Sequence, residues 1–284
     1  TAANYYVVFS KPGYLADTLS VSLTNGVITI LDATLQPLVA FNAGGMVVDV
    51  LGNGIASAEV VVFNTNFTFN STTDANGNYT INNMYEGNYE VITGLWGYIT
   101  TCDNEYIIPS TINTITLEQG YYDDFTFDFG WTVSGGVTSA SDGIWERGLP
   151  EGTNDQGVNY NPNGDVSGDC TDFAYVTGLL AGGQIGDNDV DDFNTILTSP
   201  IFDLSANQIH YINYSSWFQN GFPWGGVPND SLTISISNGS TVSVLETITS
   251  NSPNLGQWNY NSLDISEYIA PTTTMQLIIE TADW

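Results

Sequence analysis

The sequence has almost no basic residues. Its 284 residues include only two Lys and Arg, Lys11 and Arg147, against 31 Asp and Glu, which gives a formal net charge of −29. Because salt bridges cannot neutralise these carboxylates, most of them must lie in water or bind cations. A chain this negative repels phosphate backbones and anionic lipid. The charge therefore argues against nucleic-acid binding, and divalent cations are the expected ionic partners.

Residues suited to metal binding through nitrogen or sulfur, or to nucleophilic catalysis, are equally scarce. His210 is the single histidine, and Cys102 and Cys170 are the only cysteines, too few for a structural zinc site with four such ligands. No Gly-x-Ser-x-Gly turn presents a serine to a base. With so many acids, chance carboxylate pairs are expected, so a pair alone does not indicate glycoside cleavage. We predict that the chain is not an enzyme and that His210 packs in a strand.

Long apolar runs are also absent. No stretch of eighteen apolar residues occurs, so no membrane span is predicted. The chain does not open on a signal peptide, and Thr1 reads as the middle of a domain, so we expect targeting segments outside this piece. The two cysteines fall in what we interpret below as different modules, which disfavours a disulfide between them.

What the chain does have is alternation of apolar and polar residues nearly everywhere, without helical periodicity. Clusters of Gly, Asn, Asp and Pro separate the alternating segments and supply turns. This pattern predicts an all-β fold of sandwiches or barrels. The expected strands are 5–10, 18–23, 27–31, 46–50, 59–64, 79–82, 89–93, 114–117, 125–133, 172–177, 195–202, 209–218, 231–237, 242–249 and 275–281.

An internal repeat lies within the first 120 residues. Asn4-Tyr5-Tyr6-Val7 matches Asn88-Tyr89-Glu90-Val91 at an offset of 84, and Gly13-Tyr14 matches Gly97-Tyr98. The first copy lacks everything upstream of its tyrosine strand, which would leave a bare sheet edge. Residues 1–39 are therefore predicted to be the C-terminal part of a sandwich, either cut by the boundary of the sequence or completed by a neighbouring chain.

Residues 40–119 form the complete copy. Its turn Thr73-Asp74-Ala75-Asn76-Gly77 leads into a strand, with Asp74 expected to cap loop amides and Gly77 to take the left-handed conformation. Together with Gly45, Asp49, Gly54, Ala58 and Gly87-Asn88-Tyr89, this order resembles the carboxypeptidase regulatory-like domain, a small transthyretin-like (Ig-like) β-sandwich. The resemblance implies a spacer or adhesion module without an active site.

Residues 120–284 have a different texture, with more Trp and longer loops. The segment Thr195-Ile196-Leu197-Thr198-Ser199-Pro200-Ile201-Phe202-Asp203-Leu204 is similar to a strand of MAM-like jelly-roll domains, which occur in large secreted and cell-surface proteins of Bacteroidota. The resemblance implies a jelly-roll β-sandwich. We expect it to lack its last strand, because such domains continue beyond a segment like 275–280.

Calcium is the ligand that the sequence favours most. The ion takes six to eight oxygen ligands, and acid-rich loops offer Asp165 with Asp169, Asp189 with Asp191, and Asp283. By resemblance to calcium-holding jelly rolls, we predict Asp189 and Asp191 as the first ligands, with Asp165 and Asp283 as weaker ones. The alternative is that these acids are solvated loop residues.

Other contacts are predicted from aromatic residues and short motifs. Phe222 and Trp224, in a loop rich in Gly and Pro, could stack on a sugar or a protein partner, although aromatic residues also fill sandwich cores. Asp17-Thr18-Leu19 and Asp230-Ser231-Leu232 resemble O-glycosylation sites of Bacteroidota, which implies glycans on Thr18 and Ser231.

The sequence thus predicts a non-catalytic, extracellular structural or adhesive segment of a larger secreted or surface bacterial protein. It would be calcium-stabilised and able to form filaments by self-association, or to contact a glycan or cell-surface partner. The alternative function is an accessory, substrate- or carbohydrate-binding region of a secreted peptidase or glycoside hydrolase.

Overall fold

The structure, a computed structural model, describes residues 2–109, 112–135, 143–155, 157–179, 190, 193–206, 210–220 and 229–282. As predicted, the fold is all-β. Within the described residues, one 3-10 helix, Ile265–Glu267, accompanies the strands. The chain divides into two compact units, Thr1–Gly120 and Tyr121–Trp284, which we describe separately.

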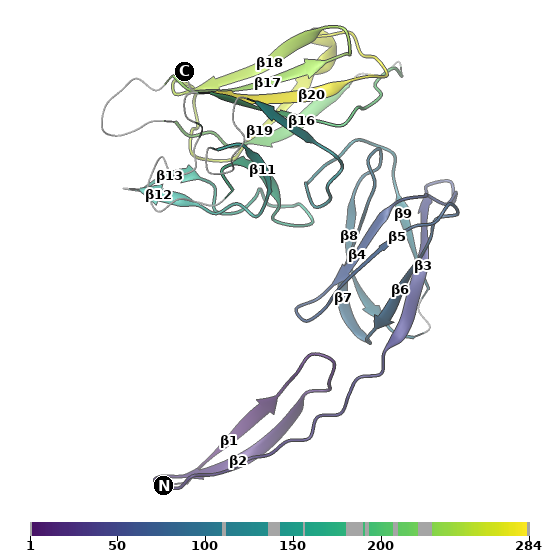
Figure 1. Ribbon diagram of the computed structural model, residues 1–284, viewed down its shortest axis with the longest axis vertical. Helices are drawn as coiled ribbons and strands as arrows, with labels where there is room; N and C mark the ends of the chain where they lie inside the picture. The colour runs from purple at the N-terminus through teal and green to yellow at the C-terminus, as the bar shows by residue number, and fades with distance from the viewer. Residues whose placement is uncertain are drawn as a thin grey trace. The chain divides into compact units, whose positions relative to one another are not determined.

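The first unit begins with an antiparallel hairpin of β1 (Ala2–Phe9) and β2 (Asp17–Thr24), drawn in purple in Figure 1. We call residues 2–38 the first copy and residues 87–120 the second copy of the repeat. Residues 27–31, predicted as a strand, form no ladder with any described strand, so that prediction was wrong. An alternating sequence forms a strand only where a partner strand supplies the ladder hydrogen bonds.

The rest of the first unit is a two-layer sandwich (Figure 1). One sheet has the order β6-β3-β9 and the other the order β5-β4-β7-β8. All neighbours are antiparallel except β3 and β9, which run parallel. The strands are β3 (Phe41–Asp49), β4 (Glu59–Phe63), β5 (Thr68–Thr72), β6 (Asn78–Met84), β7 (Gly87–Gly94), β8 (Thr101–Ile107) and β9 (Ile112–Leu117).

Alternate side chains of both sheets fill the core of this sandwich. On β4, for example, Val60 and Val62 are fully buried, while Val61 between them is only half-buried on the other face. Removing this apolar area from water is the main stabilising term of the module. The buried core consists of Ala43, Val47, Ile55, Ala58, Val60, Val62, Tyr79, Ile81, Met84, Tyr89, Val91, Ile107 and Leu117.

The turn before β6 forms as predicted. Oδ1 of Asp74 accepts hydrogen bonds from the backbone N–H groups of Asn76 at 2.8 Å and Asn78 at 2.9 Å. Gly77 has φ +83, and a Cβ there would lie 2.4 Å from the carbonyl oxygen of Val47. Both its conformation and this close approach therefore require glycine. Gly54 is equally constrained, because a Cβ at this position would lie 1.9 Å from the carbonyl oxygen of Asn76.

The second unit is built on a five-stranded antiparallel sheet in the order β10-β15-β20-β17-β18, with three two-stranded ribbons: β11-β14, β12-β13 and β16-β19. The central strand of the sheet, β20, comes last in the sequence. The strands are β10 (Thr132–Gly135), β11 (Trp145–Gly148), β12 (Thr153–Asp155), β13 (Val158–Asn161), β14 (Ala174–Thr177), β15 (Asn194–Thr198), β16 (Tyr211–Ser216), β17 (Ser231–Ser237), β18 (Val242–Thr249), β19 (Asn259–Asp264) and β20 (Gln276–Ala282).

Residues 125–133 were predicted as one strand, and this was wrong, because only the start of β10 lies in this range. Aspartate side chains turn the backbone instead. Asp123 accepts a hydrogen bond from the N–H of Phe125 at 2.8 Å, and Asp128 accepts one from the N–H of Gly130 at 3.1 Å. Phe125 has φ +59. These local bonds occupy amides that a strand would need for its ladder.

Neither cysteine is a free thiol, because Cys102 and Cys170 are both disulfide-bonded. The sequence alone disfavoured a bond between the two and left open whether they are free. Cys102 is an exposed strand residue, and its position in one module does not reveal from the sequence which groups lie beside it. In the part of the chain that the structure describes, no helix is long and apolar enough to cross a membrane.

Candidate functional site

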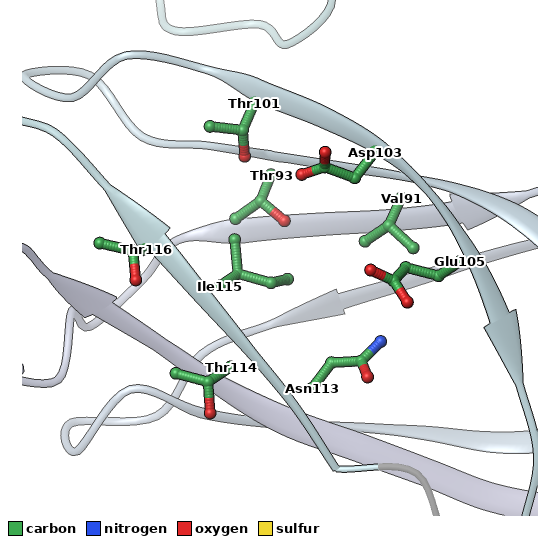
Figure 2. A pocket seen from close by; sticks show the side chains of 9 residues that line it. All are labelled: Val91, Thr93, Thr101, Asp103, Glu105, Asn113, Thr114, Ile115 and Thr116. Carbon is green, nitrogen blue, oxygen red and sulfur yellow. The ribbon is translucent and has the colours of Figure 1, made fainter.

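A polar hollow lies at one side of the sandwich, between β8 and β9, the edge strands of the two sheets (Figure 2). Its volume is about 210 Å³. Figure 2 shows two carboxylates from β8 and hydroxyl and amide groups from β7, β8 and β9 around it. It is lined by Val91, Thr93, Thr101, Asp103, Glu105, Asn113, Thr114, Ile115 and Thr116.

Asp103 and Glu105 occupy inward-facing positions of β8, on the same face as Ile107, which lies in the core. The carboxylates remain exposed because no further strand follows β8 in its sheet. Burial and the charge of Glu105 raise the pKa of the Tyr79 hydroxyl to about 12. Charged residues that point inward at a sheet edge oppose pairing with another sheet. These acids protect the edge of this sandwich.

The hydroxyl of Thr93 also faces the hollow. The residue is fully buried, and its Oγ1 has no hydrogen-bond partner. A buried hydroxyl without a partner costs roughly 1–3 kcal/mol. The hollow therefore offers two carboxylates and an unsatisfied hydroxyl for binding a polar ligand, and it contains neither a thiol nor an imidazole.

Sequence reasoning missed this hollow because β8 was not among the predicted strands. The repeat could have revealed it, since the predicted strand 18–23 lies 84 residues before 102–107. The corresponding inward positions of β2 carry Leu19 and Val21 instead of Asp103 and Glu105.

A second group of acids lies in the second unit around Asp165, one of the predicted metal ligands. Burial, together with the nearby carboxylates of Asp169 and Asp172 and a hydrogen bond shared with Asp169, raises the pKa of Asp165 to about 7. Oη of Tyr122 donates a hydrogen bond to Asp169 at 2.7 Å. Asp165 therefore favours its protonated form near neutral pH, and a cation beside it would favour the carboxylate instead.

Asp123 and Asp124 also accept hydrogen bonds within this unit. Burial raises the pKa of Asp123 to about 6, although its carboxylate accepts a hydrogen bond from Nε1 of Trp131 at 2.7 Å. Asp124 accepts one from the N–H of Cys170 at 3.1 Å. The guanidinium of Arg147 donates to the carbonyl oxygen of Phe125 at 2.7 Å. The single arginine of the sequence thus holds this loop in place.

The remaining predicted ligands cannot be placed. Asp189, Asp191 and Asp283 lie outside the described residues, as do Phe222 and Trp224. Among the described residues, no three or more His, Cys, Asp or Glu side chains form a group suited to hold a metal ion. Of the predicted calcium ligands, the structure therefore places Asp165 alone, beside Asp169.

The two predicted glycosylation sites differ in accessibility. Thr18 is exposed on β2, opposite Val8. Ser231 is half-buried on β17, which has a neighbour on each side, β18 and β20. His210 directly precedes β16, and its Nε2 lies 3.0 Å from the carbonyl oxygen of Ala206.

Comparison with protein families accounts for the sandwich of the first unit. Residues 44–127 match the model of the carboxypeptidase regulatory-like domain. This segment is similar to that family in both sequence and β-sandwich fold. The match runs from within β3 through β9 and includes the turn at Asp74 and the polar hollow. No curated protein matches the chain.

Solved structures resemble the chain only distantly. A cohesin–X-dockerin complex from Acetivibrio cellulolyticus is 19% identical over 28% of this chain and 58% of that chain, with a TM-score of 0.22. A DUF3823 family protein from Bacteroides ovatus is 10% identical over 79% and 81%, with a TM-score of 0.26. The major pilin subunit of Bacillus cereus is 12% identical over 86% and 58%, with a TM-score of 0.25. The chain thus spans little more than half the length of the first and third of these. At such scores we draw no functional conclusion from them.

Proposed function

We propose that this chain is a non-catalytic structural or adhesive segment of a larger secreted or surface protein, built from β-sandwich modules in series. The observation that carries this proposal is the match to the regulatory-like domain, whose core is filled with apolar side chains and whose hollow offers carboxylates, hydroxyls and an amide but no thiol or imidazole. Such a module suits spacing and attachment better than bond cleavage.

Two further features support an extracellular location. Both cysteines are disulfide-bonded, and disulfides persist in oxidising compartments such as the bacterial periplasm and cell surface. The net charge of −29 keeps the chain soluble and away from anionic lipid. Fractionation of the producing cells tests the location, and recovery of the protein in the cytoplasm with reduced thiols would contradict it.

We further propose that calcium stabilises the second unit at Asp165 and Asp169. A divalent cation would offset the burial and the carboxylate repulsion that raise the pKa of Asp165, and acids such as Asp189, Asp191 and Asp283 would supply further oxygens. Calcium that binds only the folded state raises the melting temperature by mass action. We expect chelation to lower the melting temperature of the wild type and to have less effect on Asp165→Asn. An unchanged melting curve after chelation would remove calcium from the proposal.

The adhesive role has a direct test. The purified chain is applied to a glycan array and to host or sister-cell surfaces, with Trp224→Ala as the matched variant. Binding that Trp224→Ala abolishes would assign the loop around Phe222 and Trp224 to glycan or partner contact. Electron microscopy of the same material tests filament formation, and monomers at every calcium concentration would exclude it. Peptidase or glycosidase activity that resides in the purified chain would overturn the non-catalytic assignment.

We propose glycosylation at Thr18 and Ser231 as an accessory feature, with Thr18 the more accessible of the two. Intact-mass analysis of protein from the native source, with Thr18→Ala and Ser231→Ala as comparisons, decides it. A mass equal to the unmodified chain would exclude both sites.

A further inference from the structure

The first copy repeats the hydrogen-bonding pattern of the second copy. In each, a glycine with positive φ precedes the second strand: Gly13 at +81 and Gly97 at +95. The carbonyl oxygen of each glycine accepts a hydrogen bond from a returning segment, from Leu38 N–H at 2.8 Å and from Gly120 N–H at 3.1 Å. The two segments therefore have the same local fold as well as related sequences.

Burial, by contrast, differs sharply between the two copies. Tyr5 is 52% exposed, whereas its counterpart Tyr89 is 2% exposed. Leu23 is 42% exposed, and its counterpart Ile107 is 4% exposed. Side chains that form the core of the second copy thus lie open to solvent in the first.

One face of the hairpin in the first copy is apolar throughout, with Tyr5, Val7 and Leu23 exposed and its other members half-buried, while Tyr6 and Val8 are exposed on the opposite face. Pairing in the hairpin sets Tyr5 opposite Val21 and Val7 opposite Leu19, and side chains two residues apart share a face. The opposite face of β2 is polar, with Thr18, Ser20 and Ser22. We call the following set the apolar face: Tyr5, Val7, Phe9, Leu19, Val21 and Leu23.

Strands β3 to β6, which precede the second copy in the same sandwich, cover the equivalent face of that copy. Their core residues, including Val47 and Val60, pack in one cluster with Tyr89 and Ile107. Strand β9 of the second copy pairs in parallel with β3. The first copy contains no counterpart of β3, which explains why residues 27–31 form no ladder despite their alternating sequence.

We propose that the apolar face binds a polypeptide segment with the strand pattern of residues 41–84, which completes a second sandwich of the regulatory-like kind. A sugar or a lipid surface would cover the apolar side chains but would leave the backbone of residues 27–36 without a parallel partner strand. A four-stranded segment would both cover the side chains and pair with this backbone. The inward positions 19 and 21 are apolar, so the charge that protects the edge at Asp103 and Glu105 is absent here. This inference does not depend on the adhesive role.

The chain itself provides the probe. A duplicate of residues 40–86 is fused directly before Ala3 of the full chain, because residue 87 corresponds to residue 3 at the offset of 84. Hydrogen exchange of the β1 and β2 amides is then compared with that in the unfused chain. We expect exchange to slow by roughly 100-fold, since a hairpin open to solvent becomes part of a cooperative core. Binding of a hydrophobic dye to the apolar face should fall in parallel.

Matched variants distinguish core formation from general stiffening. In the fusion, Val7→Asp should abolish the added protection, because its counterpart Val91 is buried in the core. Tyr6→Glu should preserve it, because the second copy carries Glu90 at that position. In the unfused chain, both variants should leave exchange in the second copy unchanged.

Three results would overturn the proposal. One is unprotected β1 amides in a fusion whose β7 amides remain protected, since the intact module then reports that the molecule is folded. Another is equal protection in Val7→Asp and in the parent fusion. The third is concentration-dependent protection of β1 in the unfused chain, which would make a second copy of this chain the occupant instead.

Discussion

The two copies of the repeat share a sequence pattern and a hairpin. The second copy packs against the core of a sandwich, whereas the first copy is exposed. Tyr89 lies in the core, and its hydroxyl donates to the carbonyl oxygen of Tyr85 at 2.9 Å, while Tyr5 faces solvent. Local sequence therefore determines the turn and the strand pairing, whereas burial depends on strands from elsewhere. The same residues stabilise a module only where those strands are present.

The largest expected difference is between Tyr89→Ala and Tyr5→Ala. Removing the buried ring of Tyr89 should lower the free energy of unfolding of the sandwich by about 3–5 kcal/mol, because a cavity remains. Removing the exposed ring of Tyr5 should change it by less than about 0.5 kcal/mol. Urea denaturation of the two variants measures this. A loss of unfolding free energy in Tyr5→Ala close to that in Tyr89→Ala would mean that other residues already bury the apolar face of the first copy.

A smaller effect is expected at Thr73, whose surroundings come from strands that the first copy lacks. Its buried hydroxyl accepts from the N–H of Ala58 at 2.8 Å and donates to the carbonyl oxygen of Ile55 at 2.7 Å. Thr73→Val leaves both backbone groups unpaired and should cost roughly 1–3 kcal/mol. Thr73→Ser keeps the hydroxyl and should recover most of the loss in the same denaturation experiment. Equal stability of both variants would show that these bonds contribute nothing net.

The turn glycines should respond alike in both copies. Gly13 and Gly97 have positive φ, which costs an L-residue roughly 1–2 kcal/mol. Gly13→Ala should therefore reduce the population of the hairpin, which cross-strand NMR contacts report. The free-energy cost should match the loss of sandwich stability that Gly97→Ala causes. A large effect at one position only would mean that the turns are not equivalent.

The last comparison is the pH dependence of stability, which should be opposite in the two units. Hydrogen bonds from Asn78 and Asn76 lower the pKa of Asp74 in the first unit, so its contribution to stability is present above pH 4 and is lost as the pH falls below it. Burial raises the pKa of Asp165 in the second unit, so stability there is highest below about pH 4 and is lost as the pH rises through about 7.

Thermal melts in chelator at pH 3, 4.5, 6 and 7.5 test this. Asp165→Asn should flatten the dependence of the second unit between pH 4 and 7, with Asp123 retaining a weaker dependence of the same sign. Asp74→Asn should weaken the acid loss of the first unit. A second unit that becomes more stable from pH 4 to 7 would contradict the raised pKa of Asp165.

Most of the fold could be predicted because alternation and turn chemistry act over short distances. The capping by Asp74 and the left-handed Gly77 were both readable from the sequence. Strand β8 was missed because Cys102, Asp103, Asn104 and Glu105 hide its alternation. Residues 27–31 show the reverse error, since they alternate but lack a partner strand. Alternation indicates which side chains belong in a core. It does not reveal whether another strand is present to pair with the backbone.

The sites were harder to predict than the fold. Asp165 was singled out from its loop, but its neighbour Asp169 accepts a hydrogen bond from the hydroxyl of Tyr122, 47 residues away in the sequence. The hollow needs β7, β8 and β9 together. Sequence shows which residues could ligate an ion or a sugar, and the pairing of distant strands decides which of them meet.

The position of β20 has a consequence for how the second unit is made. This strand lies between β15 and β17, yet residues 276–282 are the last of the sheet to be synthesised. Until they emerge from the ribosome, β17 and β18 can form only a local hairpin, and β15 has no neighbour on one side. Contacts of such long sequence separation slow folding. The unit should therefore remain open until its translation is nearly finished.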